Sequence, residues 1–231
     1  MDLKLHLDTA DMSFVEISDI YTQVYKLYDY DWWYEIQPSD VVVDIGAGIG
    51  VVSKKALDAG ASRVYMVEPN RRVLKSAIKN VSDYMIDVQP YNRVYPICAT
   101  IGKDIDSSGM YQNELYNKEE EPQVFNLQQL ITGFEIPTIS YLRVDTAGGE
   151  CNILSKEMIP LLKNHVKFIA VRVHVGNRYN SDKVFERWRD TFLIEIKDSL
   201  LFKDPSFLEK IWADNWKEQM PYSYMLYIKN W

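Results

Sequence analysis

Residues 41–50 read VVVDIGAGIG, an apolar run that leads directly into a glycine-rich turn. The run follows Pro38-Ser39-Asp40 and consists mainly of β-branched residues, which is typical of a buried parallel strand. Glycines after such a strand let the backbone turn tightly and approach a ligand without a clash from a Cβ atom. The stretch therefore predicts a first strand, a ligand-binding turn and a helix that ends near Gly60.

The rest of the chain alternates apolar runs with amphipathic segments. We predict, in order, strand 63–67, helix 70–84, strand 94–99, strand 139–144, a helix from about 150 interrupted near Pro160, strand 167–175, helix 182–198, a helix from 206 and a closing strand 222–228. Such alternation predicts an α/β fold with a mostly parallel sheet and helices on both faces. A length of 231 residues fits one large domain over residues 1–231 better than two small ones.

Two segments fall outside this alternation. Residues 1–38 are interpreted as an N-terminal helical extension, with an amphipathic helix over 13–30 whose apolar positions recur every three or four residues. Residues 100–122 are polar and have no clear periodicity, so we expect an inserted loop there. A loop of this length is either a mobile cover over the side where a substrate binds or a surface insertion.

Composition argues against several classes of protein. The net charge of −7 makes nucleic acid an unfavourable partner, because binding to phosphate backbones needs a basic surface. No run of about 18 apolar residues and no secretory leader is present, so we expect a cytoplasmic protein without a membrane segment. The two cysteines, Cys98 and Cys151, form neither a disulfide framework nor a metal cluster, and we expect both to be free.

Two acids near the glycine turn indicate which cofactor it binds. Asp44 lies two residues before Gly46, where it would repel a pyrophosphate, and the spacing G-x-G-x-G differs from the G-x-G-x-x-G of dinucleotide sites. S-adenosylmethionine has no phosphate, and its amino group and sulfonium are positive. Glu68 follows the second strand at nearly the spacing of an acid that binds ribose hydroxyls. We therefore expect S-adenosylmethionine, and a nicotinamide-dependent oxidoreductase is the less favoured alternative.

Residues 40–175 resemble the FkbM-type methyltransferase family. The matching pieces are the turn that begins at Asp44, Glu68-Pro69-Asn70, residues 123–130 (QVFNLQQL) and residues 142–150 (LRVDTAGGE). The family typically continues its fourth strand with an Asp, an acid two positions later, a Gly, a small residue and a Glu.

The chain departs from this pattern at two positions. Ala147 replaces the acid of the fourth-strand motif, and Arg172 replaces the acid that commonly stands two positions before His174. These two replacements leave open a protein that binds S-adenosylmethionine or S-adenosylhomocysteine without transferring a methyl group.

The resemblance implies a Rossmann-like class I methyltransferase fold. It also implies an S-adenosylmethionine-dependent enzyme that O-methylates a hydroxyl of a small molecule or of a sugar-containing acceptor. We assign to cofactor binding Asp44, Gly46, Ala47, Gly48, Gly50, Glu68, Pro69, Ala99 and Asp145.

The candidate catalytic residues are Asp145 and His174, at the carboxyl ends of the fourth and fifth strands, where open α/β sheets bind ligands. Either could accept the proton of a hydroxyl nucleophile, although Asp145 could instead bind the cofactor's amino group and His174 could be a structural strand-end histidine. Glu150 begins a helix, where a carboxylate interacts favourably with the dipole. Asp145, His174 and Asn177 could converge on a metal, but three loosely placed donors are weak support, and we assign no metal.

Overall fold

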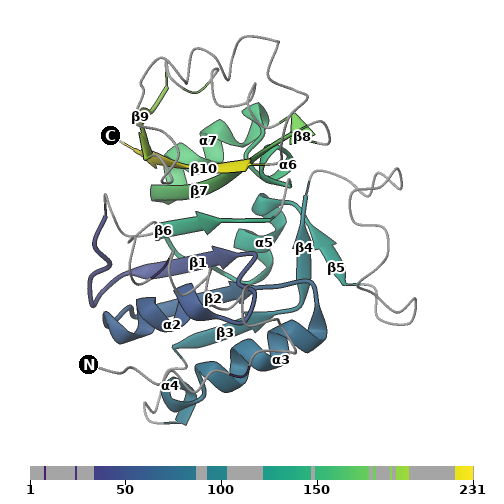
Figure 1. Cartoon of the computed structure of the whole chain (residues 1–231). Coiled ribbons are helices and arrows are strands. Elements are labelled where there is room, and N and C mark those ends of the chain that lie inside the picture. The colour runs from purple at the N-terminus through teal and green to yellow at the C-terminus, as the bar shows by residue number, and fades with distance from the viewer. Residues whose placement is uncertain are drawn as a thin grey trace. The chain divides into compact units, whose positions relative to one another are not determined.

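The computed structural model describes residues 8, 24, 34–86, 93–102, 122–146, 149–176, 179–180, 188, 191–197 and 222–230 (Figure 1). The chain divides into two compact units, one of residues 1–100 with 113–124 and the other of residues 101–112 with 125–231. Parallel strand pairs and helices occur in both units, which confirms the predicted α/β fold class with mostly parallel pairing.

The first unit contains three parallel strands in the order β3-β2-β1. They are β1 (Val41–Ile45), β2 (Arg63–Val67) and β3 (Val94–Ile97). All five residues of β1 are buried, Asp44 included, as a mainly apolar run predicts for a strand covered on both faces. Tyr65 and Tyr95 are register partners on β2 and β3, and their rings stack with centroids 4.6 Å apart.

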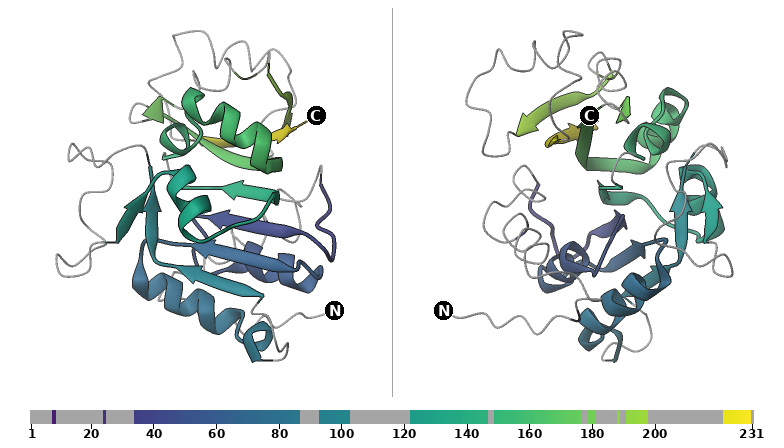
Figure 2. Two further views of the ribbon diagram at one scale, coloured as in Figure 1. Left: turned by 180° about the vertical axis from the view of Figure 1, so that it is seen from behind. Right: turned by 45° about the vertical axis from the view of Figure 1, so that its right-hand side comes forward.

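Helices follow β1 and β2 in the first unit. They are α2 (Val51–Asp58), α3 (Arg71–Asn80) and α4 (Asp83–Ile86). Helix α2 contacts β1, β2 and α3, and Figure 2 shows α2 and α3 beside these strands. The side chain of Asn70 caps α3 by accepting hydrogen bonds from the amides of Arg72 and Val73. This cap places the residues before it, Glu68 and Pro69, at the end of β2.

The second unit is built around a long central strand. Its strands are β6 (Ile139–Val144), β7 (Val166–Gly176), β8 (Tyr179–Asn180), β9 (Leu193–Lys197) and β10 (Tyr222–Lys229). Strand β6 runs parallel to β7, whereas β8 and β10 pair with β7 in the antiparallel sense. Tyr141, Phe168 and Tyr227 come from three adjacent strands and pack ring against ring in the core.

The second unit also contains short helices. They are α5 (Leu127–Gly133), α6 (Glu150–Ile153), the 3₁₀ helix η2 (Lys156–Met158) and α7 (Ile159–His165). Helices α6 and α7 contact β7. A separate two-stranded sheet is formed by β4 (Ala99–Ile101) and β5 (Gln123–Phe125).

Some predicted elements differ from the structure. The predicted strand 94–99 is two strands, since the chain leaves the parallel sheet at Cys98 and Ala99 begins β4. Helix 182–198 is wrong over its described end, because residues 193–197 form β9 and pair with β10. The helix that begins at Glu150 breaks at Leu154-Ser155 rather than near Pro160, because a proline in the first turn of α7 needs no amide donor.

Other predictions fall where nothing is described. The predicted N-terminal helix over 13–30 lies outside the described residues except Val24, and so does the helix from 206. Residues 103–121 of the expected loop also lie outside them. Within the described part of the chain, no helix combines the length and hydrophobicity that a membrane crossing requires.

Candidate functional site

The glycine turn of the first unit has a backbone that only glycine adopts readily. Gly46, Gly48 and Gly50 have φ angles of 80°, 56° and 80°, in the left-handed region that disfavours residues with a Cβ. The amides of Gly46 and Ala47 both donate to the carbonyl of Val67, at 2.9 and 3.1 Å. The G-x-G-x-G spacing is thus explained by backbone geometry, and the turn is fastened to the end of β2.

Two of these glycines have different surroundings. A Cβ at Gly50 would lie 3.1 Å from the Cβ of Ala77 and 3.2 Å from its Cα, so glycine allows α3 to approach the start of α2. A Cβ at Gly48 would meet no atom within 4 Å. Gly50 therefore serves packing, whereas the space beside Gly48 is open.

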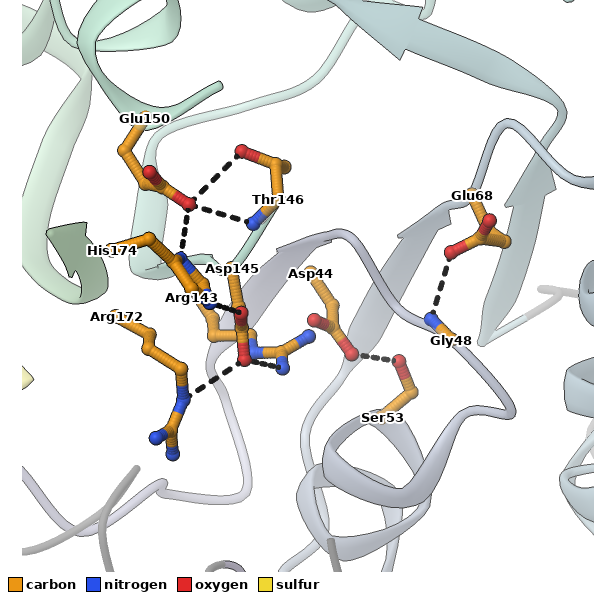
Figure 3. Close-up of polar contacts among 10 residues, drawn as sticks. All are labelled: Asp44, Gly48, Ser53, Glu68, Arg143, Asp145, Thr146, Glu150, Arg172 and His174. Atoms are coloured by element: carbon orange, nitrogen blue, oxygen red, sulfur yellow. Dashed lines mark hydrogen bonds and ion pairs between the residues drawn. The ribbon is translucent and has the colours of Figure 1, made fainter. Parts of the chain in front are cut away.

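Glu68 holds the turn from the end of β2. Its Oε2 accepts a hydrogen bond from the amide of Gly48 at 3.0 Å (Figure 3). Its Oε1 accepts one from the amide of Asn70 at 2.9 Å. Pro69, between them, accepts a weak hydrogen bond from the Cys98 thiol through its carbonyl, at 3.5 Å. The structure therefore places Glu68 and Pro69 beside the glycine turn.

Asp44 lies near the end of β1, before the glycine turn, and is held by the helix that follows the turn. Its side chain is completely buried, and its Oδ2 accepts a 2.6 Å hydrogen bond from the hydroxyl of Ser53 in α2. This contact ties the end of β1 to the helix that follows the turn. Ala47 and Ala99 are also buried, the latter in β4.

Asn80 also holds the glycine turn, a role that the sequence did not indicate. Its Nδ2 donates to the carbonyl of Ile49 in the glycine turn at 2.8 Å and to the carbonyl of Asp8 at 2.9 Å. Its Oδ1 accepts from the amide of Asp8. An asparagine at a helix end carries no sequence signal for such a contact, because the partners are 31 and 72 positions away in the chain.

The second unit gathers charged side chains at the ends of β6 and β7. Asp145 follows β6, and its Oδ2 accepts hydrogen bonds from Arg143 Nη2 at 2.7 Å and from Arg172 Nε at 3.2 Å (Figure 3). Both arginines are buried. Buried charges need compensation, and the Asp145 carboxylate supplies it for the two guanidinium groups.

Glu150 and His174 form a second contact in the same cluster. Glu150 Oε1 lies 2.9 Å from His174 Nδ1 and accepts hydrogen bonds from the amide of Thr146 at 3.1 Å and its hydroxyl at 3.4 Å. The other ring nitrogen, His174 Nε2, lies 3.9 Å from Asp145 Oδ1. The structure therefore brings together Asp145 and His174 and adds Glu150, for which the sequence indicates mainly a favourable interaction with the helix dipole.

The same three side chains could meet around a cation. Asp145, Glu150 and His174 each offer a ligand atom, and these atoms lie within 4.8 Å of one another. Two guanidinium groups already lie against Asp145, and their positive charge opposes a metal ion at this position. Asn177, the third residue that we considered from the sequence, lies outside the described residues.

Comparison with known proteins agrees with this arrangement. The family model for the methyltransferase FkbM domain matches residues 44–202, which include the glycine turn and the Asp145 cluster. The chain belongs to the FkbM methyltransferase family. A comparison with curated proteins finds no match.

Solved structures of methyltransferases are similar to this chain. An FkbM methyltransferase from Methylobacillus flagellatus KT is similar with a TM-score of 0.57 at 16% identity, over 90% of this chain and 47% of that one. This chain thus spans about half the length of that protein. A precorrin-6y C5,15-methyltransferase from Geobacter metallireducens GS-15 has a TM-score of 0.49 at 14% identity, over 91% and 89% of the two chains. The likeness to the FkbM structure confirms the class I methyltransferase fold.

One of the two departures from the usual FkbM pattern lies within the described residues. Arg172 stands where the family commonly has an acid, and here it pairs with Asp145. Ala147 lies outside the described residues. Arg172 therefore places a guanidinium group directly on the strand-end aspartate of this chain.

Proposed function

We propose that this FkbM-family protein transfers the methyl group of S-adenosylmethionine to a hydroxyl of a small-molecule or sugar-containing acceptor. The observation that carries the proposal is the turn of the first unit, where Glu68 binds the amide of Gly48 next to open space. Family membership supports methyl transfer as the reaction.

The residues of the turn fit a nucleoside. A carboxylate offers about four acceptor positions, enough for two ribose hydroxyls in addition to the amides of Gly48 and Asn70. The open space at Gly48 permits backbone and ligand to come close, which a side chain at that position would prevent. We therefore propose that Gly46, Ala47, Gly48, Glu68 and Pro69 contact the cofactor. Asp44 and Gly50 would act by holding the turn in shape.

The chemistry requires alignment and removal of a proton. Bound S-adenosylmethionine supplies an activated methyl group on a sulfonium. The protein must hold an oxygen nucleophile in line with it and accept the hydroxyl proton. We propose that Asp145 and His174 hold the hydroxyl and accept its proton, since both carry acceptor atoms and lie in one cluster.

A binding protein without transferase activity is the second candidate. The observation that favours it is the ion pair between Arg172 and Asp145, because it occupies a carboxylate oxygen at a position where the family commonly has one more acid. Detectable S-adenosylhomocysteine release with any acceptor would exclude this candidate.

The cofactor assignment is tested by thermal unfolding with added ligands. S-adenosylhomocysteine at 100 times its dissociation constant should stabilise the protein by about 2.7 kcal/mol, which raises Tm by roughly 5–10 °C for a chain of this size. A nicotinamide dinucleotide should leave Tm unchanged. The reverse pattern would contradict the proposal and favour an oxidoreductase.

A variant ties the binding to Glu68. Glu68→Ala should weaken S-adenosylhomocysteine binding in calorimetry by about 1.5–3 kcal/mol for each lost bond to the carboxylate. Asp83→Ala, which removes an exposed acid of the same unit, is the matched control and should bind like the wild type. Unchanged affinity in Glu68→Ala would show that this residue only shapes the turn.

Transfer is tested with S-adenosylmethionine and a panel of small hydroxyl compounds. The panel should include catechols, monosaccharides and glycosides, and the readout is release of S-adenosylhomocysteine. We expect turnover with at least one hydroxyl compound and none with the matched deoxy or methoxy analogue.

A further inference from the structure

The contact between Glu150 and His174 determines where the imidazole carries its proton. Glu150 Oε1 already accepts hydrogen bonds from the amide and the hydroxyl of Thr146. An oxygen held by these donors acts as an acceptor toward the ring as well, so the hydrogen in the 2.9 Å contact belongs to His174 Nδ1. In a neutral imidazole only one nitrogen is protonated, and Nε2 then carries the lone pair.

Burial separates the roles of the two residues. The Glu150 side chain is completely buried, whereas 24% of the His174 side chain is exposed. Glu150 is therefore closed off from a substrate and can act only through the histidine. His174 Nε2 faces the Asp145 carboxylate, 3.9 Å from Oδ1. The separation exceeds a hydrogen bond, and a hydroxyl could contact both atoms at once.

Asp145 is the weaker of the two possible proton acceptors. Its Oδ2 binds Arg143 and Arg172, both of them buried. Protonation of this carboxylate would weaken its ion pairs with two buried guanidinium groups, which is unfavourable. His174 has the opposite surroundings, because the carboxylates of Asp145 and Glu150 lie on its two sides.

We propose that His174 Nε2 accepts the proton of the acceptor hydroxyl and that Glu150 is the positioning residue that sets the required tautomer. This inference rests on the proposed methyl transfer. The O–H bond of the acceptor breaks and its proton bonds to Nε2, while an electron pair of the oxygen forms the new bond to the methyl carbon. The carbon–sulfur bond breaks with its electron pair on sulfur. The products are the methyl ether, S-adenosylhomocysteine and an imidazolium, which returns the proton to water.

The tautomer is measured directly by long-range ¹H–¹⁵N correlation of the histidine rings. The chain has only three histidines, and His174→Gln identifies the signal of interest. Under alkaline conditions, at which the ring shifts no longer change, we expect His174 to be protonated at Nδ1 and not at Nε2. A wild-type ring protonated at Nε2 would by itself overturn the inference.

Two substitutions at Glu150 separate positioning from general structure. Glu150→Gln keeps a side-chain oxygen that can accept the hydrogen bond from the Thr146 amide, so the Nδ1-protonated tautomer should persist. Glu150→Ala removes the acceptor, and the ring should become a mixture of tautomers. Glu157→Gln changes an exposed acid of the neighbouring η2 and is the control, which should leave the spectrum unchanged. A single Nδ1-protonated form in folded Glu150→Ala would overturn the role of Glu150.

Kinetics test the same pair on whichever hydroxyl compound of the panel is methylated. His174→Gln should lower kcat by about 100-fold or more, the lower range for a positioned proton acceptor. Glu150→Gln should lower kcat about 10-fold with KM for S-adenosylmethionine unchanged, because a neutral amide replaces the charged acceptor of the Nδ1 hydrogen bond. Unchanged kcat in His174→Gln would overturn the inference. If a chelator abolishes activity and added Mg²⁺ restores it, the inference would also be overturned, in favour of a metal at Asp145, Glu150 and His174.

These outcomes are distinct from failure of the proposed function. A protein that does not bind S-adenosylhomocysteine but shows the Nδ1-protonated ring would refute methyl transfer and leave the tautomer assignment intact. A protein that binds the ligand but carries the proton on Nε2 would refute the assignment of His174 and leave the cofactor intact.

Discussion

Single residues of the candidate site differ in how far the sequence predicts them. The three glycines of the turn were recognisable because the G-x-G-x-G pattern reports a backbone requirement that is local to the chain. Glu150 was not recognisable as a partner of His174, because the contact joins residues 24 positions apart through the packing of α6 on β7. The ion pair of Arg172 with Asp145 depends on the same kind of distant packing.

Asp145 should contribute to stability as well as to the site. Asp145→Asn removes the negative charge between two buried guanidinium groups, and we expect it to lower the free energy of unfolding by about 3 kcal/mol, as for a broken buried ion pair. Urea denaturation of the variant and the wild type measures this difference.

A second substitution checks the electrostatic cause. Adding Arg172→Gln to Asp145→Asn removes one of the two guanidinium charges that pair with Asp145, so the double variant should be more stable than additive losses predict. Strictly additive losses would show that Asp145 and Arg172 do not interact in solution.

Whole elements were predicted well where burial alone dictates them. The strands at 41–45, 63–67 and 139–144 are mainly apolar segments, and the structure confirms all three. Strand β9 was predicted as a helix because a five-residue segment carries little periodicity, and its pairing with β10 is what makes it a strand. Helix α5 was missed although Asn126 and Gln129 form a capping box, a signal present in the sequence.

The glycine turn and α2 should respond differently to alanine at two positions. Gly50→Ala should destabilise the fold strongly, because the new Cβ would press on the backbone of Ala77 in α3 at a left-handed φ. Gly48→Ala should cost only about 1–2 kcal/mol for the left-handed conformation, yet it should abolish measurable S-adenosylhomocysteine binding by filling the space beside the turn. Thermal unfolding and calorimetry of both variants test this contrast. Full binding by Gly48→Ala would place the ligand elsewhere.

The molecule as a whole has an electrostatic character that bears on the acceptor. Its net charge is −7. Several of the described basic side chains are engaged within the protein. Lys54 pairs with Asp58, Lys55 donates to the carbonyl of Val24, and Arg93 donates to the carbonyls of Leu57 and Ala61. The sequence predicted this character directly, since net charge does not depend on folding. The partners of the individual cations emerged only from the structure.

We therefore expect nucleic acid to be neither bound nor methylated. Binding to a phosphate backbone draws on several lysines and arginines that together displace counterions, and an acidic surface opposes it. Fluorescence anisotropy with labelled transfer RNA at physiological salt should give a dissociation constant weaker than about 10⁻⁴ M, the weak end of non-specific binding. Total RNA offered with methyl-labelled S-adenosylmethionine should take up no label, while a hydroxyl compound of the panel does. Tight RNA binding that weakens steeply with added salt would reveal a basic surface that the net charge conceals, and it would replace the small-molecule acceptor with a nucleic acid.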